Sequence, residues 1–183
     1  MHRRPAMHYD TTFILQLKRQ DPKAVKSWYL AHFEFLMRQA SRFFIEQNEQ
    51  LTAVHNAQLK ALKHLDQFTP GTSMEAWLSV ILRNELIDLY RKNQRWKFFS
   101  FQLSGQVAET ADFEFELDRQ IEQKRVEQIL KDLPPTTRFV FGFYVFEEMK
   151  PRQIAEHLKM NLATVRWHLK FAKQQLKKTM RHD

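Results

Sequence analysis

The sequence predicts an all-α protein of two small helical domains joined by an acidic linker, the second domain being a helix-turn-helix. Apolar residues recur at three- and four-residue spacings along most of the chain, and no segment alternates convincingly as a strand. Formal charge divides the 183 residues into three parts: +6 over residues 1–98, −5 over 99–118 and +7 over 119–183. Residues 150–178 have the pattern of two short helices around a tight turn. We therefore expect domains at 1–98 and 119–183.

The first domain is predicted as a helical bundle. Residues 1–9 lack an apolar period and are expected to be a mobile tail. Asp21-Pro22 marks a helix start, and the apolar spacing beyond it continues to about Phe44. A second helix is expected over 51–68, ended by the Thr-Pro-Gly at 69–71. Thr72 and Glu75 stand at capping-box spacing and open a third helix that reaches about Trp96.

The connector and the start of the second domain differ sharply in charge. Residues 99–118 contain five acidic and no basic residues, so this linker cannot follow DNA phosphates. A helix is expected over 119–133, stopped by Pro134-Pro135. The Phe- and Val-rich residues 139–146 have a strand-like composition, but that composition also makes a buried helix, which we predict here.

The helix-turn-helix begins at Pro151, whose missing amide hydrogen costs nothing in a first turn. Asn161 is the expected cap of the second helix. That helix has one apolar stripe and is otherwise cationic, with no acid from Leu162 to Arg181, which suits a helix in a groove lined by phosphates. A solvated basic face is the alternative. The stripe comprises Val165, Leu169, Ala172 and Leu176, and the cations are Arg166, Lys170, Lys173, Lys177, Lys178 and Arg181.

Composition narrows the class of function. A net charge of +8 favours a polyanionic partner, nucleic acid or an acidic membrane surface, over a neutral metabolite. The absence of cysteine excludes disulfides and thiolate zinc sites and is compatible with the cytoplasm. No long apolar segment stands at the N-terminus, so we expect a cytoplasmic protein without membrane insertion. Three glycines form no phosphate loop, no catalytic motif is present and the eight His are dispersed. We expect neither an enzyme, a metal site nor a cofactor.

The helix-turn-helix resembles region four, the promoter-reading domain of bacterial RNA polymerase sigma factors, most closely those of the extracytoplasmic-function (ECF) class. The resemblance is carried by Ile154-Ala155-Glu156, Leu158, Thr164-Val165, Leu169, Ala172 and Leu176. Lys159 departs from it, because the family usually has glycine in this turn. The resemblance implies that the second helix reads the −35 element of double-stranded promoter DNA. The residues expected to contact it are Thr164, Arg166, Trp167, Lys170, Phe171 and Lys173.

The first domain resembles region two of the same family, which opens the promoter. The similar residues are 59–68, Ala76-Trp77-Leu78, Arg83-Asn84, Ile87-Asp88 and Arg91. The resemblance implies that the turn before the Trp77 helix captures a flipped −10 base and that the helix lies along the melted non-template strand. The expected −10 contacts are Arg83, Asn84, Arg91, Lys92 and Arg95. Trp77 begins the apolar periodicity and is expected in the core rather than as a stacking platform.

Core RNA polymerase is the partner that the resemblance implies. The positions aligned with the family's acidic docking segment are Leu51, Thr52, His55 and Asn56, none of them negatively charged, so Glu46 and Glu49 are possible substitutes. The linker either threads through polymerase or is a solvated spacer. An anti-sigma protein is a further possible partner. The function predicted is promoter-specific initiation; the rival is a stand-alone helix-turn-helix regulator with a sensory or dimerising N-terminal domain.

Two aromatic residues are unusual for a recognition helix. At about 100° per residue, Trp167 and Phe171 fall one turn apart opposite the apolar stripe, beside Lys170 and Gln174. We expect both to be exposed. They either meet thymine methyl groups in the DNA groove or cover an apolar patch on the first domain.

Overall fold

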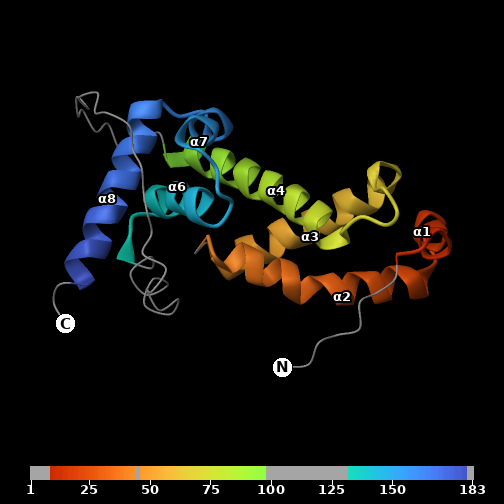
Figure 1. Cartoon of the computed structure of the whole chain (residues 1–183). Coiled ribbons are helices and arrows are strands. Elements are labelled where there is room, and N and C mark those ends of the chain that lie inside the picture. The colour runs from red at the N-terminus through yellow and green to blue at the C-terminus, as the bar shows by residue number, and fades with distance from the viewer. Residues whose placement is uncertain (1–8, 44–45, 98–131, 181–183) are drawn as a thin grey trace. The chain divides into compact units, whose positions relative to one another are not determined.

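The computed structural model describes residues 9–43, 46–97 and 132–180, and every regular element in that part of the chain is helical, as predicted (Figure 1). The predicted linker at 99–118, most of the predicted 119–133 helix and residues 1–8 lie outside the described residues. The elements in chain order are α1 (Thr11–Lys18), α2 (Pro22–Ser41), α3 (Gln47–Lys63), the short 3₁₀ helix η1 (Leu65–Gln67), α4 (Met74–Lys97), α6 (Pro135–Val145), α7 (Pro151–Leu158) and α8 (Leu162–Met180).

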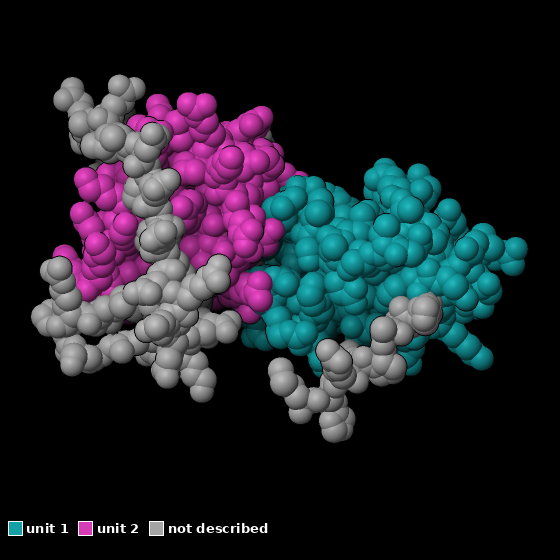
Figure 2. All heavy atoms as spheres, in the orientation of Figure 1, with its two compact units in different colours: residues 1–40, 47–86 teal, residues 41–46, 87–183 magenta. Residues whose placement is uncertain are grey.

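The chain forms two compact units, shown in different colours in Figure 2. Unit 1 comprises residues 1–40 and 47–86, and unit 2 comprises residues 41–46 and 87–183. Their boundary falls within α4, so the last turns of this helix belong to the same unit as α6, α7 and α8.

Unit 1 is built on three long helices, and the buried faces of α2 and α4 follow the predicted periodicity. Helix α2 buries Trp28 and Leu36 completely, and α4 contributes Met74, Leu78 and Leu82. Helix α3 buries small side chains, which allow neighbouring backbones to approach closely; they are Ala53, Ala57 and Ala61. Gln58 is also buried there, and its side-chain amide donates to the carbonyl of Tyr29 at 3.0 Å. The core therefore follows the amphipathic pattern, and its buried polar side chains, Gln58, His32 and Glu85, each have a partner.

The helix boundaries correct three predictions. Helix α3 starts four residues before the expected 51 and ends at Lys63, after which η1 continues the turn. Helix α4 is capped by Ser73, whose Oγ accepts from the Ala76 amide at 3.1 Å, whereas the Thr72 hydroxyl donates to the Thr69 carbonyl. Helix α1 was not expected: Asp10 caps it, accepting from the Phe13 amide at 2.8 Å. At the starts of α1 and α4 local side-chain bonds decide the helix end, which apolar spacing does not report.

Unit 2 places α6 at the centre of its core. Phe139, Val140, Phe141 and Phe143 are all buried, so the strand-like composition does make a helix, as predicted. Pro135 occupies the first turn, where a missing donor is tolerated. Helix α6 packs against α7 and α8, and α7 packs against α8. Helix α6 therefore fixes the position of the helix-turn-helix, which α7 and α8 form.

Candidate nucleic-acid interface

The turn between α7 and α8 is closed by backbone hydrogen bonds around Lys159. This residue has φ 53° and ψ 45°, the left-handed conformation that glycine adopts most readily. The Lys159 amide donates to the Glu156 carbonyl at 3.3 Å, and the Met160 amide donates to the Ala155 carbonyl at 2.9 Å. This is a Schellman ending, and Lys159 takes the place that glycine usually has in it. The lysine therefore preserves the turn geometry at some cost in backbone strain.

Side-chain bonds cap the starts of both helices, and the one at the second helix was predicted. Gln153 accepts from the Lys150 amide at 2.9 Å through its side-chain oxygen and so satisfies the entry to α7. The Asn161 side-chain oxygen accepts from the Ala163 amide at 2.8 Å, which confirms its predicted role at the start of α8.

The predicted apolar stripe of α8 is confirmed, and it faces the core. Val165, Leu169, Ala172 and Leu176 are between 0 and 3% exposed. The opposite side carries exposed side chains at successive turns, namely Trp167, Lys170, Gln174, Lys177 and Lys178. Because the stripe is fixed by packing, the cationic and aromatic face is held outward. This surface, residues 166–178 without the stripe, is called the α8 face below.

Trp167 and Phe171 form a stacked pair on the α8 face. Their ring centroids are 5.3 Å apart and the planes are inclined by 13°. Trp167 is 42% exposed, as expected, whereas Phe171 is half-buried. Of the other predicted −35 contacts, Lys170 is exposed, and Thr164, Arg166 and Lys173 are half-buried. The pair is thus a flat apolar surface between cations.

His168 anchors α8 to α6 and was not predicted to do so. Its Nδ1 lies 2.9 Å from the hydroxyl of Thr137, a residue with no exposed surface. Burial lowers the pKa of His168 from its usual 6.5 to about 4. The imidazole is therefore neutral at pH 7 and adds a hydrogen bond, not a charge, between α8 and α6.

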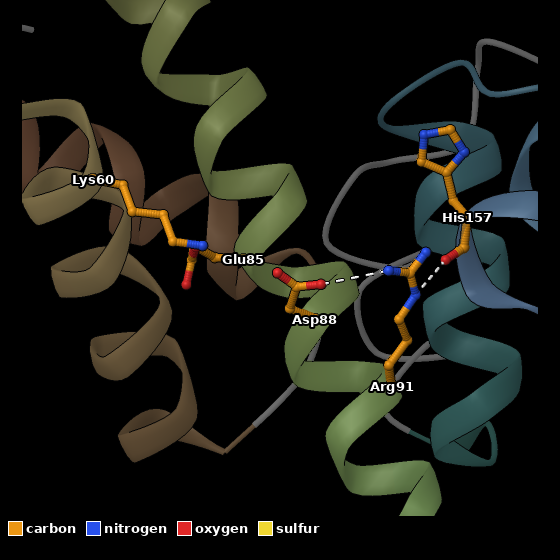
Figure 3. Close-up of polar contacts among 5 residues, drawn as sticks. All are labelled: Lys60, Glu85, Asp88, Arg91 and His157. Atoms are coloured by element: carbon orange, nitrogen blue, oxygen red, sulfur yellow. Dashed lines mark hydrogen bonds and ion pairs between the residues drawn. The ribbon is translucent and has the colours of Figure 1, made fainter. Parts of the chain in front are cut away.

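The predicted −10 residues are spread along α4. Asn84 and Lys92 are exposed and Arg83 is half-buried, while Arg95 lies in the last turns of the helix. Arg91 is also half-buried, and its Nε donates to the backbone carbonyl of His157 at 2.8 Å (Figure 3). One of its terminal nitrogens is 3.5 Å from the Asp88 carboxylate. This track therefore contains a cation that is already bound within the chain.

The predicted polymerase-binding positions lie on α3. Thr52, His55 and Asn56 are exposed and Leu51 is half-buried. The His55 ring lies about 6 Å from the rings of Tyr29 and Phe33, which stack on each other. Leu59, one turn further along α3, is 56% exposed. The surface is thus aromatic and apolar rather than acidic.

A hydrogen-bonded pair in unit 1 corrects the predicted extent of the mobile tail. The Tyr9 hydroxyl bonds Nε2 of the buried His32, and the Tyr9 ring contacts Phe68 at 6.5 Å between centroids. Phe68 in turn packs against Trp77 at 5.4 Å. Burial lowers the pKa of His32, against the opposing effect of Glu75, and so favours the neutral ring. Trp77 itself is half-buried and so lies at the edge of the core.

The described residues contain neither a metal-binding cluster nor a membrane-spanning helix. No group of three or more His, Cys, Asp or Glu side chains there could hold a metal ion. Among the helices described, none is long and apolar enough to cross a membrane.

Comparison with known proteins matches both helical parts of the chain to one family. Residues 28–96 match Sigma-70 region 2, and residues 123–176 match Sigma-70, region 4. The rival interpretation, a stand-alone regulator, is therefore wrong, because the part that it required to be a sensory domain matches a sigma region.

Individual relatives agree with these matches. The chain is 28% identical over 124 residues to RNA polymerase sigma factor YlaC of Bacillus subtilis (strain 168), which covers 67% of this chain and 72% of that protein. It is 38% identical over 68 residues to ECF RNA polymerase sigma factor EcfG of Rhodopseudomonas palustris (strain TIE-1), covering 34% and 38% respectively.

Two solved structures are also similar. CnrH in complex with the cytosolic domain of CnrY aligns with a TM-score of 0.46 at 21% identity, over 94% of this chain and 97% of that one. The sigma factor RpoE of Bartonella quintana, in complex with the anti-sigma factor NepR, aligns with a TM-score of 0.46 at 22% identity, over 86% and 97%.

A region 2 match over the first helices and a region 4 match over the helix-turn-helix define the order of a two-region sigma factor. The chain belongs to the ECF-type RNA polymerase sigma factors, which have no catalytic activity of their own and direct promoter-specific initiation by the polymerase.

Proposed function

We propose that this sigma factor reads the −35 element with the α8 face. The observation that carries the proposal is that the two sides of α8 differ in exposure. The apolar stripe is no more than 3% exposed, whereas the opposite side presents Trp167, Lys170 and Gln174. The buried stripe holds the helix at a fixed rotation, so these side chains can enter a major groove together. Arg166, Lys170 and Lys173 bind phosphates or guanine, and the Trp167–Phe171 pair meets thymine methyl groups. Thr164 lies in the first turn of α8 and contacts the sugar-phosphate backbone of the DNA.

The first domain, residues 1–98 in this proposal, opens the −10 element. Arg83, Asn84, Arg91, Lys92 and Arg95 provide cations and one amide along α4, which suits a melted non-template strand. Residues 99–118 are the linker and residues 119–183 the −35 domain. Neutralising Arg91, Lys92 and Arg95 together should reduce the slope of log K against log salt by about one unit for each phosphate that is no longer bound. An unchanged slope, with unchanged permanganate reactivity of the opened promoter, would remove this track from the DNA surface.

Core polymerase docks on α3. Leu51, Thr52, His55 and Asn56 supply this surface without a negative charge, so the exposed Leu59 should contribute much of the affinity by burial. Replacing Leu59 by Ser should weaken core binding about tenfold, as expected for a leucine that becomes buried on binding. Leu15→Ser on α1, where Leu15 is 48% exposed, is the matched control and should bind normally.

The place of action follows from the partner. Core polymerase and promoter DNA are cytoplasmic, and we place this protein with them. An anti-sigma protein is a further partner expected for a member of this family. It can be sought by capture on the full chain.

Transcription in vitro tests the proposal directly. Core polymerase is supplied with the full chain and a library of promoters, and the transcripts are sequenced. We expect a set of start sites that share one −35 and one −10 sequence, absent with core alone. Start sites that are identical with and without the chain would overturn the proposal. The double variant Trp167→Ser/Phe171→Ser should relax the −35 sequence while keeping the −10 sequence.

A further inference from the structure

The turn at 69–73, which joins η1 to α4, is exposed at every residue and takes its shape from bonds within itself. The Thr72 amide donates to the Thr69 carbonyl at 3.2 Å, and the Thr72 hydroxyl donates to the same carbonyl at 2.7 Å. Gly71 bends the chain with a φ of 88°. These features fix the shape of the turn, whereas its position on unit 1 depends on the residues that flank it.

Two aromatic rings flank the turn and lie against each other. Phe68 directly precedes it and is 4% exposed, and Trp77 lies near the start of α4. Their ring centroids are 5.4 Å apart. The Trp77 amide donates to the carbonyl of Ser73, the last residue of the turn, at 3.2 Å. Because packed aromatic rings share a large contact area, this pair holds the two ends of the turn together.

Tyr9 adds a third ring and joins the pair to the core of α2. Its ring meets that of Phe68 edge to face, with 6.5 Å between centroids and 79° between planes. The Tyr9 hydroxyl is bonded to Nε2 of His32, which is 2% exposed. The His32 ring in turn lies 5.7 Å from that of Trp28, which has no exposed surface. A residue from the segment before α1 thus connects the base of the turn to the fixed interior of unit 1.

The hydroxyl and the imidazole form a bond between neutral groups. Burial, and then the charge of Glu75, raise the pKa of Tyr9, so its hydroxyl keeps its proton at pH 7. Burial lowers the pKa of His32, against Glu75, and favours the neutral ring. The Glu75 carboxylate also accepts from the Ser73 hydroxyl at 3.3 Å, so it acts both on this pair and on the end of the turn. Loss of the bond would take a partner from a buried nitrogen, so the bond resists breaking.

The position of an exposed turn matters for anything that it binds. A turn that moved freely would have to be ordered by its ligand, and the entropy lost in ordering would lower the affinity. Contacts that fix the turn beforehand remove that cost. The rings that flank 69–73 therefore have a consequence for binding even though they lie beneath it.

We propose that Tyr9 and His32 are positioning residues for −10 recognition, holding the turn at 69–73, through Phe68 and Trp77, where it receives a flipped base. The inference rests on the proposed function, opening of the −10 element by the first domain, and on the resemblance that implies base capture by this turn. The cations of α4 are separate from this contact. Loss of Tyr9 should therefore weaken recognition of one base and leave phosphate binding unchanged.

Three variants of the full chain separate the contributions of the ring and of its hydroxyl. Tyr9→Ala removes both, and Tyr9→Phe removes the hydroxyl alone. Leu15→Ser, on the exposed side of α1, is the control for a change in the N-terminal segment. Circular dichroism measures the helix content of each. If Tyr9→Ala lost helix content, Tyr9→Phe would still test the bond with the ring in place.

The binding assay uses the holoenzyme, the chain assembled with core polymerase. The probes are fluorescein-labelled single strands of the non-template −10 sequence, one intact and others with a single abasic site at each position in turn. In wild type the abasic site at the captured position should weaken binding about tenfold, as expected for the loss of one recognised base. Tyr9→Ala should reduce that loss to about twofold, and Tyr9→Phe to a value between the two. The losses at other positions, and the salt dependence with the intact strand, should match wild type.

A second measurement follows the turn without DNA. In the chain labelled with 5-fluorotryptophan, the ¹⁹F resonance of Trp77 is assigned by its loss in Trp77→Phe. We expect this resonance to shift in Tyr9→Ala and to stay in place in Leu15→Ser. An unchanged loss at the captured position in folded Tyr9→Ala would overturn the proposal, even if the resonance moved, and so would an equal weakening of every strand. If no abasic site weakened binding by wild type, base capture itself would be refuted, while the resonance still decides whether Tyr9 holds the turn.

Discussion

Helices α4 and α8 are both long, basic and preceded by a turn, yet one cation on each is placed differently. On α8 the exposed Lys170 stands beside Trp167, opposite a stripe that is fully packed. On α4 the side chain of Arg91 is bound to the carbonyl of His157, and Tyr90 next to it is buried. Counts of Lys and Arg cannot distinguish these two helices. Packing, not composition, places Arg91 against the carbonyl of His157.

The turns that precede the two helices differ in the same way. The turn at 69–73 is exposed throughout and uses Gly71 at φ 88°. The turn before α8 uses Lys159 at φ 53°, held by the Schellman hydrogen bonds. The first turn relies on glycine and hydroxyl bonds, and the second on a strained residue fixed by two packed helices. The four predictions that follow separate the contributions of packing, protonation, aromatic contact and strain.

The largest effect should come from removing the packing under one helix at a time. Leu169 in α8 and Leu82 in α4 are each 1% exposed. Replacing either by Ala should lower the free energy of unfolding by about 2–5 kcal/mol, measured by urea denaturation. With the protein still folded, Leu169→Ala should weaken −35 binding and Leu82→Ala should weaken −10 strand binding. If each variant weakened both kinds of DNA to the same degree, the two helices would not be independent reading surfaces.

The next largest effect should come from protonation of His168, which joins α8 to α6. The folded pKa of His168 is about 4 and the unfolded value is 6.5, so below pH 6.5 the unfolded chain binds the proton more tightly. The stability contributed by the neutral ring is present above pH 6.5 and is lost as the pH falls toward 4, by about 2 kcal/mol after allowance for partial exposure. His168→Gln should lose this part of the pH dependence in urea titrations from pH 7 to 4. An identical slope in wild type and variant would show that the Thr137 contact does not depend on the neutral ring.

The sequence predicted most of the fold and less of the interface. Apolar spacing is set by burial, so α2, α4, α7 and α8 and the complete α8 stripe could be read from it. Helix α1 could not, because its stability comes from the Asp10 cap and two buried residues in only eight, too few for a clear period. The Asp10 cap was the one usable signal.

Long-range contacts account for what was missed at the site. The bond from Arg91 to His157 joins residues 66 apart, and the Tyr9–His32 bond joins residues 23 apart. No local pattern encodes either pairing. The sequence places Arg91 on the helix that begins before Trp77, but its hydrogen bond to His157 depends on a residue in another element. The role of His168 was missed for the same reason, because its partner Thr137 lies 31 residues earlier.

A smaller effect should come from the stacked pair on α8. Deoxyuridine differs from thymine only by the missing methyl group, so replacing thymines of the −35 element by deoxyuridine tests methyl contact alone. Wild-type holoenzyme should bind the substituted promoter about fourfold more weakly per contacted methyl, as expected for ~0.8 kcal/mol per buried methyl-sized group. Trp167→Ser/Phe171→Ser should bind both promoters equally. If wild-type holoenzyme bound the thymine and deoxyuridine promoters equally, Trp167 and Phe171 would have no role in thymine recognition, even if the cations still hold the DNA.

The smallest effect concerns Lys159, and it compares the two turns directly. Its left-handed backbone costs about 1 kcal/mol for a residue with a Cβ, and glycine removes that cost but adds entropy to the unfolded chain. Lys159→Gly should therefore raise the free energy of unfolding by about 0.5 kcal/mol, whereas Lys159→Ala, which keeps the Cβ and loses the charge, should not. Gly71→Ala makes the reverse change in the turn before α4, where a Cβ meets open space and only the φ of 88° opposes it, and should lower stability by about 1 kcal/mol. Equal stability of Lys159→Gly and Lys159→Ala in urea denaturation would show that the turn before α8 holds no strain. In that case the left-handed lysine is relaxed by the two helices it joins.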